Sequence, residues 1–370
     1  MLTMRRGTAN AGRPAGEQRQ VFRYVVRPRS AAAPDLQPAR RRRGADALLL
    51  AWTVACALAI LGAGPTGALA KTCGGTIACA CGDTVIEDTV LTADLGVCDT
   101  TALRIRTGVM LDCAGFTITG SDLSNAKFGV ELDGATGARV RNCRVTKFRR
   151  GIRIYGGSGN VLRGNETFGN KYGIDLAGTT QRNVLRGNFV HDNRDEGIHV
   201  GGSHRNKIVA NEISYNKREN LYLLESNGNL VKGNLAKRSG AAAIFVKHSS
   251  RNRFVRNRTE DTALQLRGGS RRNVFEGNYL KGNGYLLEAF EEPDGWRYPS
   301  GNTMTDDCIR KTDFCFRFFG AFDNVATGTR VDARCAPPEK NPVTSEARGG
   351  QEPTGNVVTL AEHGCFDDPF

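Results

Sequence analysis

The segment NVLRGNETFGNKYGIDLAGTTQR, residues 160–182, opens a repeat that decides the fold of this 370-residue chain. The next segment, NVLRGNFVHDNRDEGIHVGGSHR at residues 183–205, has the same length and the same asparagine positions. The first asparagine returns every 23 residues, and in the last case after 21, at Asn160, Asn183, Asn206, Asn229, Asn252 and Asn273. A second asparagine follows each of them by five residues. Such a fixed period indicates one supersecondary unit per copy.

Each copy contains short runs in which apolar and polar residues alternate. The clearest runs are GIDL at 173–176, GIHV at 197–200, NLYL at 220–223 and AIFV at 243–246. Alternation with a period of two predicts strands with one face in the core and one face outside. Three such strands per copy cannot close a core alone, but stacked copies can. The repeat therefore predicts an all-β parallel β-helix, with about ten coils in a single domain.

The asparagines of this repeat are predicted to be scaffold residues. Asparagine tolerates the left-handed backbone of tight turns, and its amide both donates and accepts hydrogen bonds. In stacked coils the same position recurs at the strand spacing of about 4.8 Å, so amides can bond along the stack. We expect Asn302, Asn324 and Asn356 to continue the first column if residues 291–299 and 337–355 are insertions, the second of them an exposed loop.

The formal net charge of +13 is concentrated at the start of the chain. Residues 1–70 contain eleven arginines and three acidic residues, which gives +8, whereas the remainder has 40 basic and 35 acidic residues, which gives +5. This distribution argues against nucleic-acid binding, which would need a basic helix or basic residues interleaved with aromatic ones.

The basic stretch is instead typical of an export signal. Four arginines at 40–43 precede an apolar run at 47–61, and the small residues GALA follow at 67–70. This pattern predicts cleavage after Ala70 and a secreted or periplasmic protein without a membrane anchor; a retained anchor is the alternative. We expect a basic, disordered leader at 1–46, the signal region at 47–70, a cysteine-rich cap with the first coils at 71–128, regular coils at 129–290, and C-terminal coils with insertions and a second cap at 291–370.

Cysteine usage also indicates an oxidising compartment. Ten cysteines follow the predicted cleavage site, and none lies between the two groups Cys73, Cys79, Cys81, Cys98, Cys113, Cys143 and Cys308, Cys315, Cys335, Cys365. An even number at the two ends of a solenoid predicts disulfides that fasten the terminal caps. A metal site at Cys79 and Cys81 is the alternative, although the spacing is not that of a zinc ribbon.

The N-terminal cap residues resemble a known family. The stretches CACGD at 79–83 and LDCAGFTI at 111–118, followed by the asparagine-rich coils, are similar to secreted bacterial right-handed parallel β-helix proteins. The coils resemble the NosD-type, carbohydrate-binding and sugar-hydrolase repeats of the pectate-lyase-like superfamily. The resemblance implies a single-stranded right-handed parallel β-helix (solenoid) with disulfide-stabilised caps. It does not specify an activity, because that superfamily contains lyases, hydrolases, epimerases and proteins of no known activity.

Candidate functional residues lie on the outer side of the alternating strands. The outward residue between the two inward ones is, coil by coil, Glu131, Arg153, Asp175, His199, Tyr222, Phe245, Gln265 and Leu286, a set that we call the middle row. Neighbours in this row are one strand spacing apart, so we expect them to line a shallow groove. The alternative is an alternation of charges that only keeps the surface soluble.

Polysaccharide is the partner that this row predicts. As a binding surface, it would use Glu131, Gln265 and Lys247 for hydroxyls or carboxylates, with Tyr222 and Phe245 stacked on sugar rings. As a lyase or epimerase of uronate polymers, it would use His199 as base, Arg153 to neutralise the substrate carboxylate, Tyr222 as acid and Asp175 to orient the pair. A structural or interaction rod of the cell envelope is the third hypothesis.

Cofactors are not firmly implied by the sequence. The resemblance to NosD-type proteins suggests copper, but the five histidines and two methionines after the signal form no recognisable ligand group. Calcium is a candidate because Asp306, Asp307, Asp367 and Asp368 offer oxygen ligands, and solvated turns are the alternative for these acid pairs.

Overall fold

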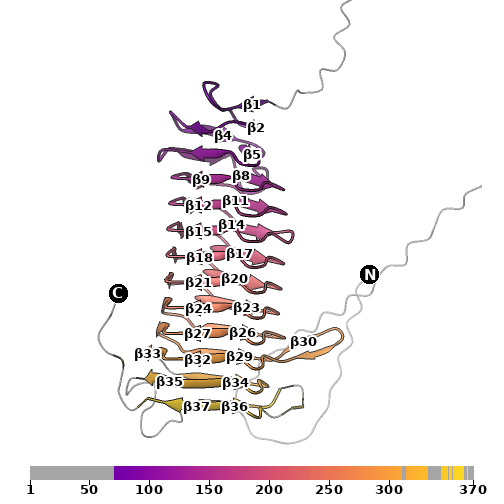
Figure 1. Ribbon diagram of the computed structural model, residues 1–370, viewed down its shortest axis with the longest axis vertical. Coiled ribbons are helices and arrows are strands. Elements are labelled where there is room, and N and C mark those ends of the chain that lie inside the picture. Colours follow the sequence, from indigo (N-terminus) through magenta and orange to yellow (C-terminus); the bar gives the residue numbers. More distant parts are fainter. Residues whose placement is uncertain are drawn as a thin grey trace, which may run out of the picture. The chain divides into compact units, whose positions relative to one another are not determined.

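The computed structural model describes residues 71–310, 314–331, 343–348, 350, 351, 353–361 and 365. The predicted leader and signal region at 1–70 lie outside these residues. Within them every regular element is a strand, and no helix is long and apolar enough to cross a membrane. The strands stack in parallel, coil on coil, which confirms the predicted parallel β-helix (Figure 1).

Each coil contributes one strand to each of three columns, which we call sheets 1, 2 and 3. Within the described ranges, sheet 1 has 13 strands. This number exceeds the ten coils expected, because the caps also supply strands. The strands of sheet 1 are β1 (Thr72–Cys73), β2 (Asp83–Val85), β5 (Leu103–Ile105), β8 (Phe128–Asp133), β11 (Arg150–Tyr155), β14 (Tyr172–Ala177), β17 (Ile198–Gly201), β20 (Leu221–Leu224), β23 (Ile244–Lys247), β26 (Leu264–Arg267), β29 (Tyr285–Glu288), β34 (Phe316–Phe319) and β36 (Val343–Glu346).

Sheets 2 and 3 are short-stranded columns that join through β35 near the C-terminus. Sheet 2 consists of β3 (Thr89–Val90), β6 (Met110–Asp112), β9 (Arg139–Arg141), β12 (Val161–Arg163), β15 (Val184–Arg186), β18 (Lys207–Val209), β21 (Leu230–Lys232), β24 (Arg253–Val255), β27 (Val274–Glu276), β32 (Thr303–Thr305), β35 (Val325–Val331) and β37 (Val357–Leu360). Sheet 3 consists of β4 (Leu95–Cys98), β7 (Thr117–Gly120), β10 (Arg144–Thr146), β13 (Glu166–Phe168), β16 (Phe189–His191), β19 (Glu212–Ser214), β22 (Leu235–Lys237), β25 (Arg258–Glu260), β28 (Tyr279–Lys281) and β33 (Cys308–Arg310).

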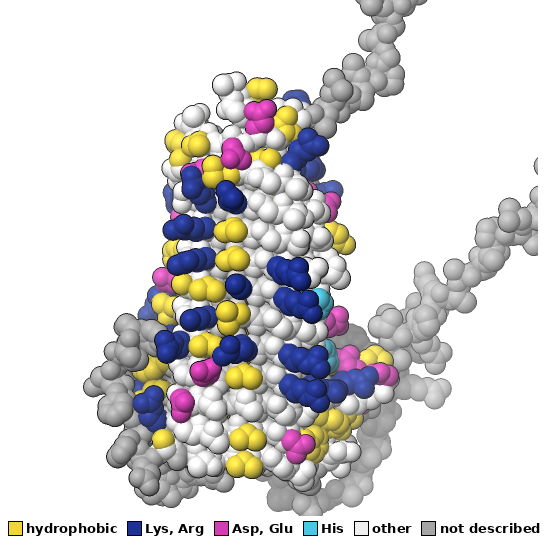
Figure 2. All heavy atoms as spheres, in the orientation of Figure 1, with side chains coloured by type: hydrophobic (Ala, Val, Ile, Leu, Met, Phe, Trp, Pro, Cys, Tyr) yellow, Lys and Arg dark blue, Asp and Glu magenta, His cyan; other side chains and the backbone are white. Residues whose placement is uncertain are grey.

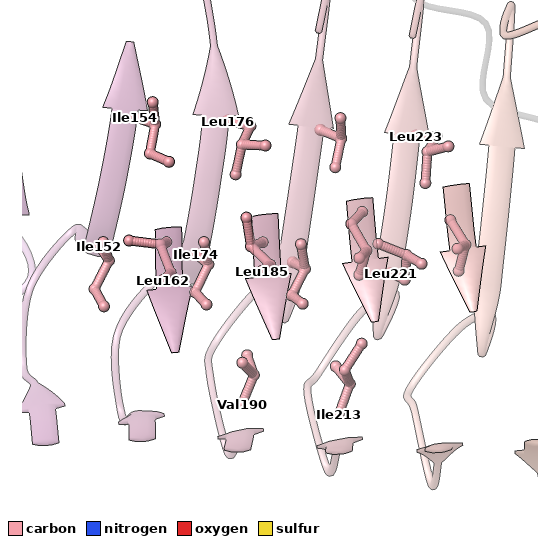
Figure 3. Close-up of a cluster of buried hydrophobic side chains, with 14 of the residues drawn as sticks. Ile152, Ile154, Leu162, Ile174, Leu176, Leu185, Val190, Ile213, Leu221 and Leu223 are labelled. Atoms are coloured by element: carbon pink, nitrogen blue, oxygen red, sulfur yellow. The ribbon is translucent and has the colours of Figure 1, made fainter. Parts of the chain in front are cut away.

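The core is a continuous column of aliphatic side chains from all three sheets. Ile152 and Ile154 of sheet 1 and Leu162 of sheet 2 are fully buried, as are Val190 and Ile213 of sheet 3. Figure 3 shows these side chains pointing into the space between the sheets, with equivalent residues repeated in each coil. A single coil could not exclude water from them, so burial comes from stacking.

The predicted asparagine columns are present and buried. Around Asn211 the Oδ1 atom accepts from Asn188 N at 3.0 Å and from Asn188 Nδ2 at 2.8 Å. The Nδ2 atom of Asn211 donates to Leu185 O at 3.1 Å and to Asn234 Oδ1 at 2.9 Å. Each amide thus links three coils and leaves no polar atom unpaired. The first column runs unbroken from Asn160 through Asn302 and Asn324 to Asn356, as expected.

A hydroxyl column lies beside the first asparagine column and was not predicted. Its members each precede the first asparagine by three residues, so their spacing was visible in the sequence. Ser203 N donates to Ser226 Oγ at 3.0 Å, and Ser226 N donates to Ser249 Oγ at 2.9 Å. Thr180 and Ser270 extend the column at its two ends. Backbone N–H groups at this turn are therefore paired by side chains of the next coil.

Asp307 takes the place of asparagine at the end of the second column. Its Oδ1 accepts from Asn278 N at 2.6 Å, and its Oδ2 accepts from Tyr285 Oη at 2.7 Å. Burial raises the pKa of Asp307 to about 7, although these hydrogen bonds oppose the shift. Asp307 is therefore a scaffold residue, whose fully buried carboxyl oxygens accept hydrogen bonds from Asn278 and Tyr285. Asp367 and Asp368 lie outside the described residues.

Disulfides fasten the ends of the solenoid. The N-terminal cap contains Cys73–Cys79, Cys81–Cys98 and Cys113–Cys143, and the C-terminal region contains Cys308–Cys365. Cys315 is also disulfide-bonded, whereas Cys335 lies outside the described residues. The alternative of a metal site at Cys79 and Cys81 is wrong, because both sulfurs are in disulfide bonds.

The two predicted insertions differ from each other. Residues 290–297 form an antiparallel hairpin of β30 (Phe290–Glu292) and β31 (Gly295–Arg297), consistent with an insertion. The second segment, residues 337–355, was expected to be an exposed loop, but it contains β36, which pairs in parallel with β34. A sheet end offers unpaired backbone groups to any extended segment, so these residues pair despite their loop-like composition.

We predict that Asn211→Ala lowers the free energy of unfolding by at least about 2 kcal/mol, because it leaves buried donors of Asn188 and the Leu185 carbonyl unpaired. The urea midpoint measures the loss. Asn227→Ala is the matched control, since Asn227 is exposed. Equal losses in the two variants would contradict a supporting role for the buried column.

We predict that Asp307→Asn becomes progressively more stable than the parent protein as the pH rises from about 4 to about 7. The unfolded carboxyl ionises near 3.8 and the folded one near 7. Ionisation between these values therefore favours unfolding, by up to about 4 kcal/mol at neutral pH. Urea unfolding across this range measures the difference, and Asp306→Asn on the exposed neighbour is the control. A pH-independent difference would contradict the assignment.

Candidate functional site

The middle row forms as predicted on the outer side of sheet 1. The register pairs Arg153 with Glu131 and Asp175, then His199 with Asp175 and Tyr222. Phe245, Gln265 and Leu286 continue it. Parallel pairing without a register shift thus makes residues that are 20–24 positions apart in the sequence neighbours in space.

The row is more buried than an exposed groove would be. Glu131 is 8% exposed, Asp175 1% and Phe245 7%. These three side chains of the expected shallow groove are therefore largely covered by their neighbours. Long basic side chains of neighbouring coils lie against them: Arg150 forms an ion pair with Asp175, and the Arg267 guanidinium carbon is 5.8 Å from the centroid of the Phe245 ring.

Asp175 and His199 form the most defined pair of the site. His199 Nδ1 lies 2.8 Å from Asp175 Oδ1, and Arg150 contacts the other carboxylate oxygen. Burial by itself would raise the pKa of Asp175, but the His199 hydrogen bond and the Arg150 charge outweigh it and lower the pKa. The Asp175 carboxylate thus accepts the contact of His199 Nδ1, and Nε2 of the imidazole points away from this carboxylate.

Arg153 is held between two carboxylates and two aromatic rings. Its Nη1 lies 3.5 Å from Glu131 Oε1 and its Nε lies 3.9 Å from Asp175 Oδ2. The guanidinium carbon is 4.7 Å from the centroid of the Phe128 ring and 4.3 Å from that of Tyr155. Its orientation is therefore fixed before any ligand binds.

Glu131 lies at the N-terminal end of the row. Desolvation raises its pKa, although Arg104 and Arg153 oppose the shift. A hollow of about 620 Å³ adjoins it, lined in part by Arg104 and Asp133. Carboxylate and guanidinium groups in this hollow can both reach a polar ligand.

Three charged residues of the site were missed by sequence reasoning. Glu196 and Glu219 precede the row by three residues in adjacent coils, and both are buried. Arg218 Nη1 lies 3.4 Å from Glu196 Oε1, and Arg218 Nε lies 3.5 Å from Glu219 Oε2. Burial raises the pKa of Glu196. The signal was present as the dipeptides DE at 195–196 and RE at 218–219, but they fall outside the alternating run.

Tyr222 faces this acidic pair. Burial, together with the negative charges of Glu219 and Glu196, raises the pKa of Tyr222 to about 12. The phenol therefore stays protonated at neutral pH and can donate a hydrogen bond. Its ring centroid is 5.6 Å from that of His199, so the two groups border the same point of the row.

The expected aromatic platform for sugars is not formed. The Tyr222 and Phe245 rings stack on each other with centroids 5.1 Å apart and planes 16° apart. In-register strands place such rings face to face along the stack, so their faces cover one another. The prediction that Phe245 stacks on a sugar is wrong for this arrangement, since Phe245 is buried.

The other predicted binding residues lie toward the hairpin. Lys247 Nζ is 3.5 Å from Glu292 Oε1 and 3.9 Å from the centroid of the Phe290 ring. His248 Nε2 also contacts Glu292, at 2.8 Å. Gln265 is half-buried between Phe245 and Leu286. The hairpin β30–β31 thus lies against Lys247 and His248 through Glu292 and Phe290.

Metal ligation finds little support in the part of the chain that the structure describes. No group of three or more His, Cys, Asp or Glu side chains there is arranged to hold an ion.

We predict that Asp175→Asn lowers the free energy of unfolding at pH 7 by about 3–5 kcal/mol, because it breaks a buried charged pair. The pKa of Asp175 is lowered from 3.8 in the folded chain. Its stabilising charge is thus present above pH 4 and is lost as the pH falls through the folded value, so the difference should narrow in acid. Urea unfolding at several pH values tests this, with exposed Asp133→Asn as control. A difference that does not change with pH would contradict the pairing.

Comparisons with known proteins support the fold. A family model described as a right handed beta helix region matches residues 92–217, 128–280 and 191–316, which together cover more than half of the chain. The Dettilon tailspike protein is similar in structure, with a TM-score of 0.56 and 16% identity over 71% of this chain. No curated protein sequence matches.

Two carbohydrate-active enzymes are more distant in structure. The catalytic unit of the GH87 alpha-1,3-glucanase from Streptomyces thermodiastaticus has a TM-score of 0.44 and 12% identity over 79% of this chain. The A-module of the Azotobacter vinelandii mannuronan C-5 epimerase has a TM-score of 0.39 and 12% identity over 76% of this chain and 89% of its own. This chain spans 60% of the tailspike and 61% of the glucanase. Because the family model covers most of the solenoid, the chain belongs to the right-handed β-helix family.

Proposed function

We propose that the protein binds a polysaccharide along the outer side of sheet 1, over the middle row. The observation that carries this proposal is the concentration of partly buried ionisable groups around Asp175, His199 and Tyr222. Burying ionisable groups costs free energy, and the fold of the solenoid does not require these groups. Displaced pKa values clustered on one surface mark a functional site more often than a passive one.

The chemistry of the row suits sugar hydroxyls and carboxylates. Glu131 and Glu196 accept hydrogen bonds, Arg153 and Arg218 donate them, and Tyr222 keeps its proton at neutral pH. From Glu131 to Gln265 the row spans six strand spacings, about 29 Å. A polymer of several sugars could therefore contact successive coils, whereas a monosaccharide would use only one or two.

A second candidate is catalysis by proton transfer, as in a lyase or epimerase of uronate polymers. The specific observation that favours it is the hydrogen bond between Asp175 and His199 Nδ1, which leaves Nε2 as the basic atom. His199 Nε2 would remove the proton beside the sugar carboxylate, while Arg153 stabilises the negative charge that develops there.

Tyr222 would complete either reaction. In a lyase, the electron pair of the broken carbon–hydrogen bond forms a carbon–carbon double bond and expels the glycosidic oxygen, which Tyr222 protonates. In an epimerase, no glycosidic bond breaks, and Tyr222 returns a proton to the opposite side of the same carbon. The epimerase reaction requires the phenol across the sugar from His199, whereas the lyase reaction requires it beside the glycosidic oxygen.

We predict that the purified protein is retarded by acidic polysaccharides such as polygalacturonate or alginate in affinity gels. Unsaturated products, or solvent deuterium at the sugar carbon, would establish turnover. His199→Ala should abolish turnover, and Tyr222→Phe should reduce it at least about 100-fold, the usual range for a proton donor. His204→Ala is the matched control, because His204 lies in the turn between sheets 1 and 2.

The outcomes separate the hypotheses. Retardation without turnover would support binding alone and contradict the catalytic candidate. Retardation that persists unchanged when Tyr222, Glu131 and Arg153 are replaced would contradict binding at this row. Absence of retardation on every polysaccharide would contradict the proposal and leave a structural rod.

A further inference from the structure

A second charged surface lies on the outer side of sheet 2, away from the middle row. Four consecutive coils, with strands β12, β15, β18 and β21, present three outward positions each: one in the preceding turn and two in the strand. Six of these positions carry exposed cations, and we call this set the basic face: Arg163, Arg182, Arg186, Arg205, Lys207 and Lys232. Figure 2 shows Lys and Arg side chains in columns along this side of the solenoid.

The basic face has no internal neutralisation. The other six outward positions of the four coils are Gly159, Val161, Val184, Val209, Gly228 and Leu230, so no acidic residue is present. None of the six cations forms an ion pair with any residue that the structure describes. Sheet 3 of the same coils behaves differently, since Arg144 pairs with Glu166 and Lys237 pairs with Glu212, each at 2.8 Å.

The strand register places like charges opposite each other. Arg163 of β12 pairs with Arg186 of β15, so the two outward side chains start about one strand spacing apart. Like charges in directly opposed positions destabilise a sheet. An anion outside the protein, between or along these guanidinium groups, would remove this repulsion.

The turn positions also favour a role beyond the fold. Arg182 and Arg205 have left-handed backbones, with φ of 57° and 55°. Gly159 and Gly228 occupy the same turn position in the neighbouring coils, with φ of 65° and 67°. A left-handed conformation costs a residue with a Cβ roughly 1–2 kcal/mol, a cost that glycine avoids. Arginine at these sites therefore adds charge at the expense of local stability.

We propose that the basic face binds a linear acidic polysaccharide that runs along the solenoid axis. Guanidinium groups bind carboxylate or sulfate groups in a bidentate manner, and successive coils repeat them at the strand spacing. Val161 and Val184 are neighbours in one column and offer a small aliphatic contact for a sugar ring, and Lys207 separates them from Leu230. The outward positions of these coils carry no aromatic side chain for stacking on bases, which favours a polysaccharide over a single-stranded nucleic acid.

This surface is independent of the proposed function on sheet 1. The basic face holds the polymer by its anionic groups, whereas the middle row contacts it with mixed carboxylates, imidazole and phenol. The two surfaces belong to different sheets of the same coils, so each can be altered while the other is kept.

The test compares two variants of the full chain that lose the same number of charges. The first is the quadruple variant Arg163→Gln, Arg182→Gln, Arg186→Gln and Arg205→Gln. The matched control is Lys147→Gln, Arg149→Gln, Arg194→Gln and Lys217→Gln, which removes four exposed cations between sheets 3 and 1. Both variants retain the basic leader, so its contribution is the same in each. Circular dichroism and urea unfolding verify that both fold.

Affinity electrophoresis with polygalacturonate, chondroitin sulfate and neutral dextran measures binding at low and at physiological salt. We expect the first variant to bind the acidic polymers at least about tenfold more weakly at low salt, and to show a shallower dependence on salt. The control should stay within about twofold of the parent, because scattered exposed cations contribute little. Tighter binding of chondroitin sulfate, which carries carboxylate and sulfate groups, than of polygalacturonate, which carries carboxylate groups alone, would indicate that sulfate contributes to recognition.

Three outcomes would overturn the proposal. These are equal losses in the two quadruple variants, unchanged binding in the first variant, and tighter binding of duplex DNA or of phosphatidylserine vesicles than of either acidic polysaccharide. Adding Tyr222→Phe to the first quadruple variant and to the parent separates the surfaces: the loss of acidic-polymer binding caused by the four arginine substitutions should be the same with and without Tyr222→Phe, whereas any further loss caused by Tyr222→Phe belongs to the middle row.

Discussion

Buried amide hydrogen bonds between successive coils are the constraint on which the rest of this structure depends. Each asparagine side chain accepts from the coil before it and donates to the coil after it and to a backbone carbonyl. Turns that would otherwise bury unpaired polar groups are thereby satisfied without water. Because an amide fits only at the correct position, the columns also fix the register of all three sheets.

Fixed register has a second effect, which is to place each residue beside its equivalents in the coils above and below. The core benefits, because aliphatic residues stack on aliphatic residues and Phe254 stacks on Phe275 with ring centroids 4.6 Å apart. On the surface, the fixed register places like charges side by side unless acidic and basic residues alternate from coil to coil. Sheets 1 and 3 alternate acid and base, and the central part of sheet 2 does not.

The middle row shows how burial and charge interact on such a surface. Asp175 is buried yet ionised, because His199 and Arg150 compensate for its desolvation. Glu196 is less fully compensated, and its pKa rises. The two carboxyl groups thus differ in the direction of their pKa shifts because their neighbours differ. The same arrangement rigidifies the row before any ligand binds.

The sequence by itself determined the repeat, the strand alternation, the buried columns and the members of the middle row. Each follows from a local period, and the 23-residue spacing of Asn160, Asn183 and Asn206 converts directly into neighbours in space. Only the tertiary structure decided which side chains from other positions of the coils contact the middle row. Glu196, Glu219 and Arg218 join the site, Phe245 becomes buried, Asp307 becomes part of the scaffold and residues 343–346 become a strand. These depend on how side chains of different lengths cover one another and on which backbone edge is free, and neither is encoded in the spacing of residues.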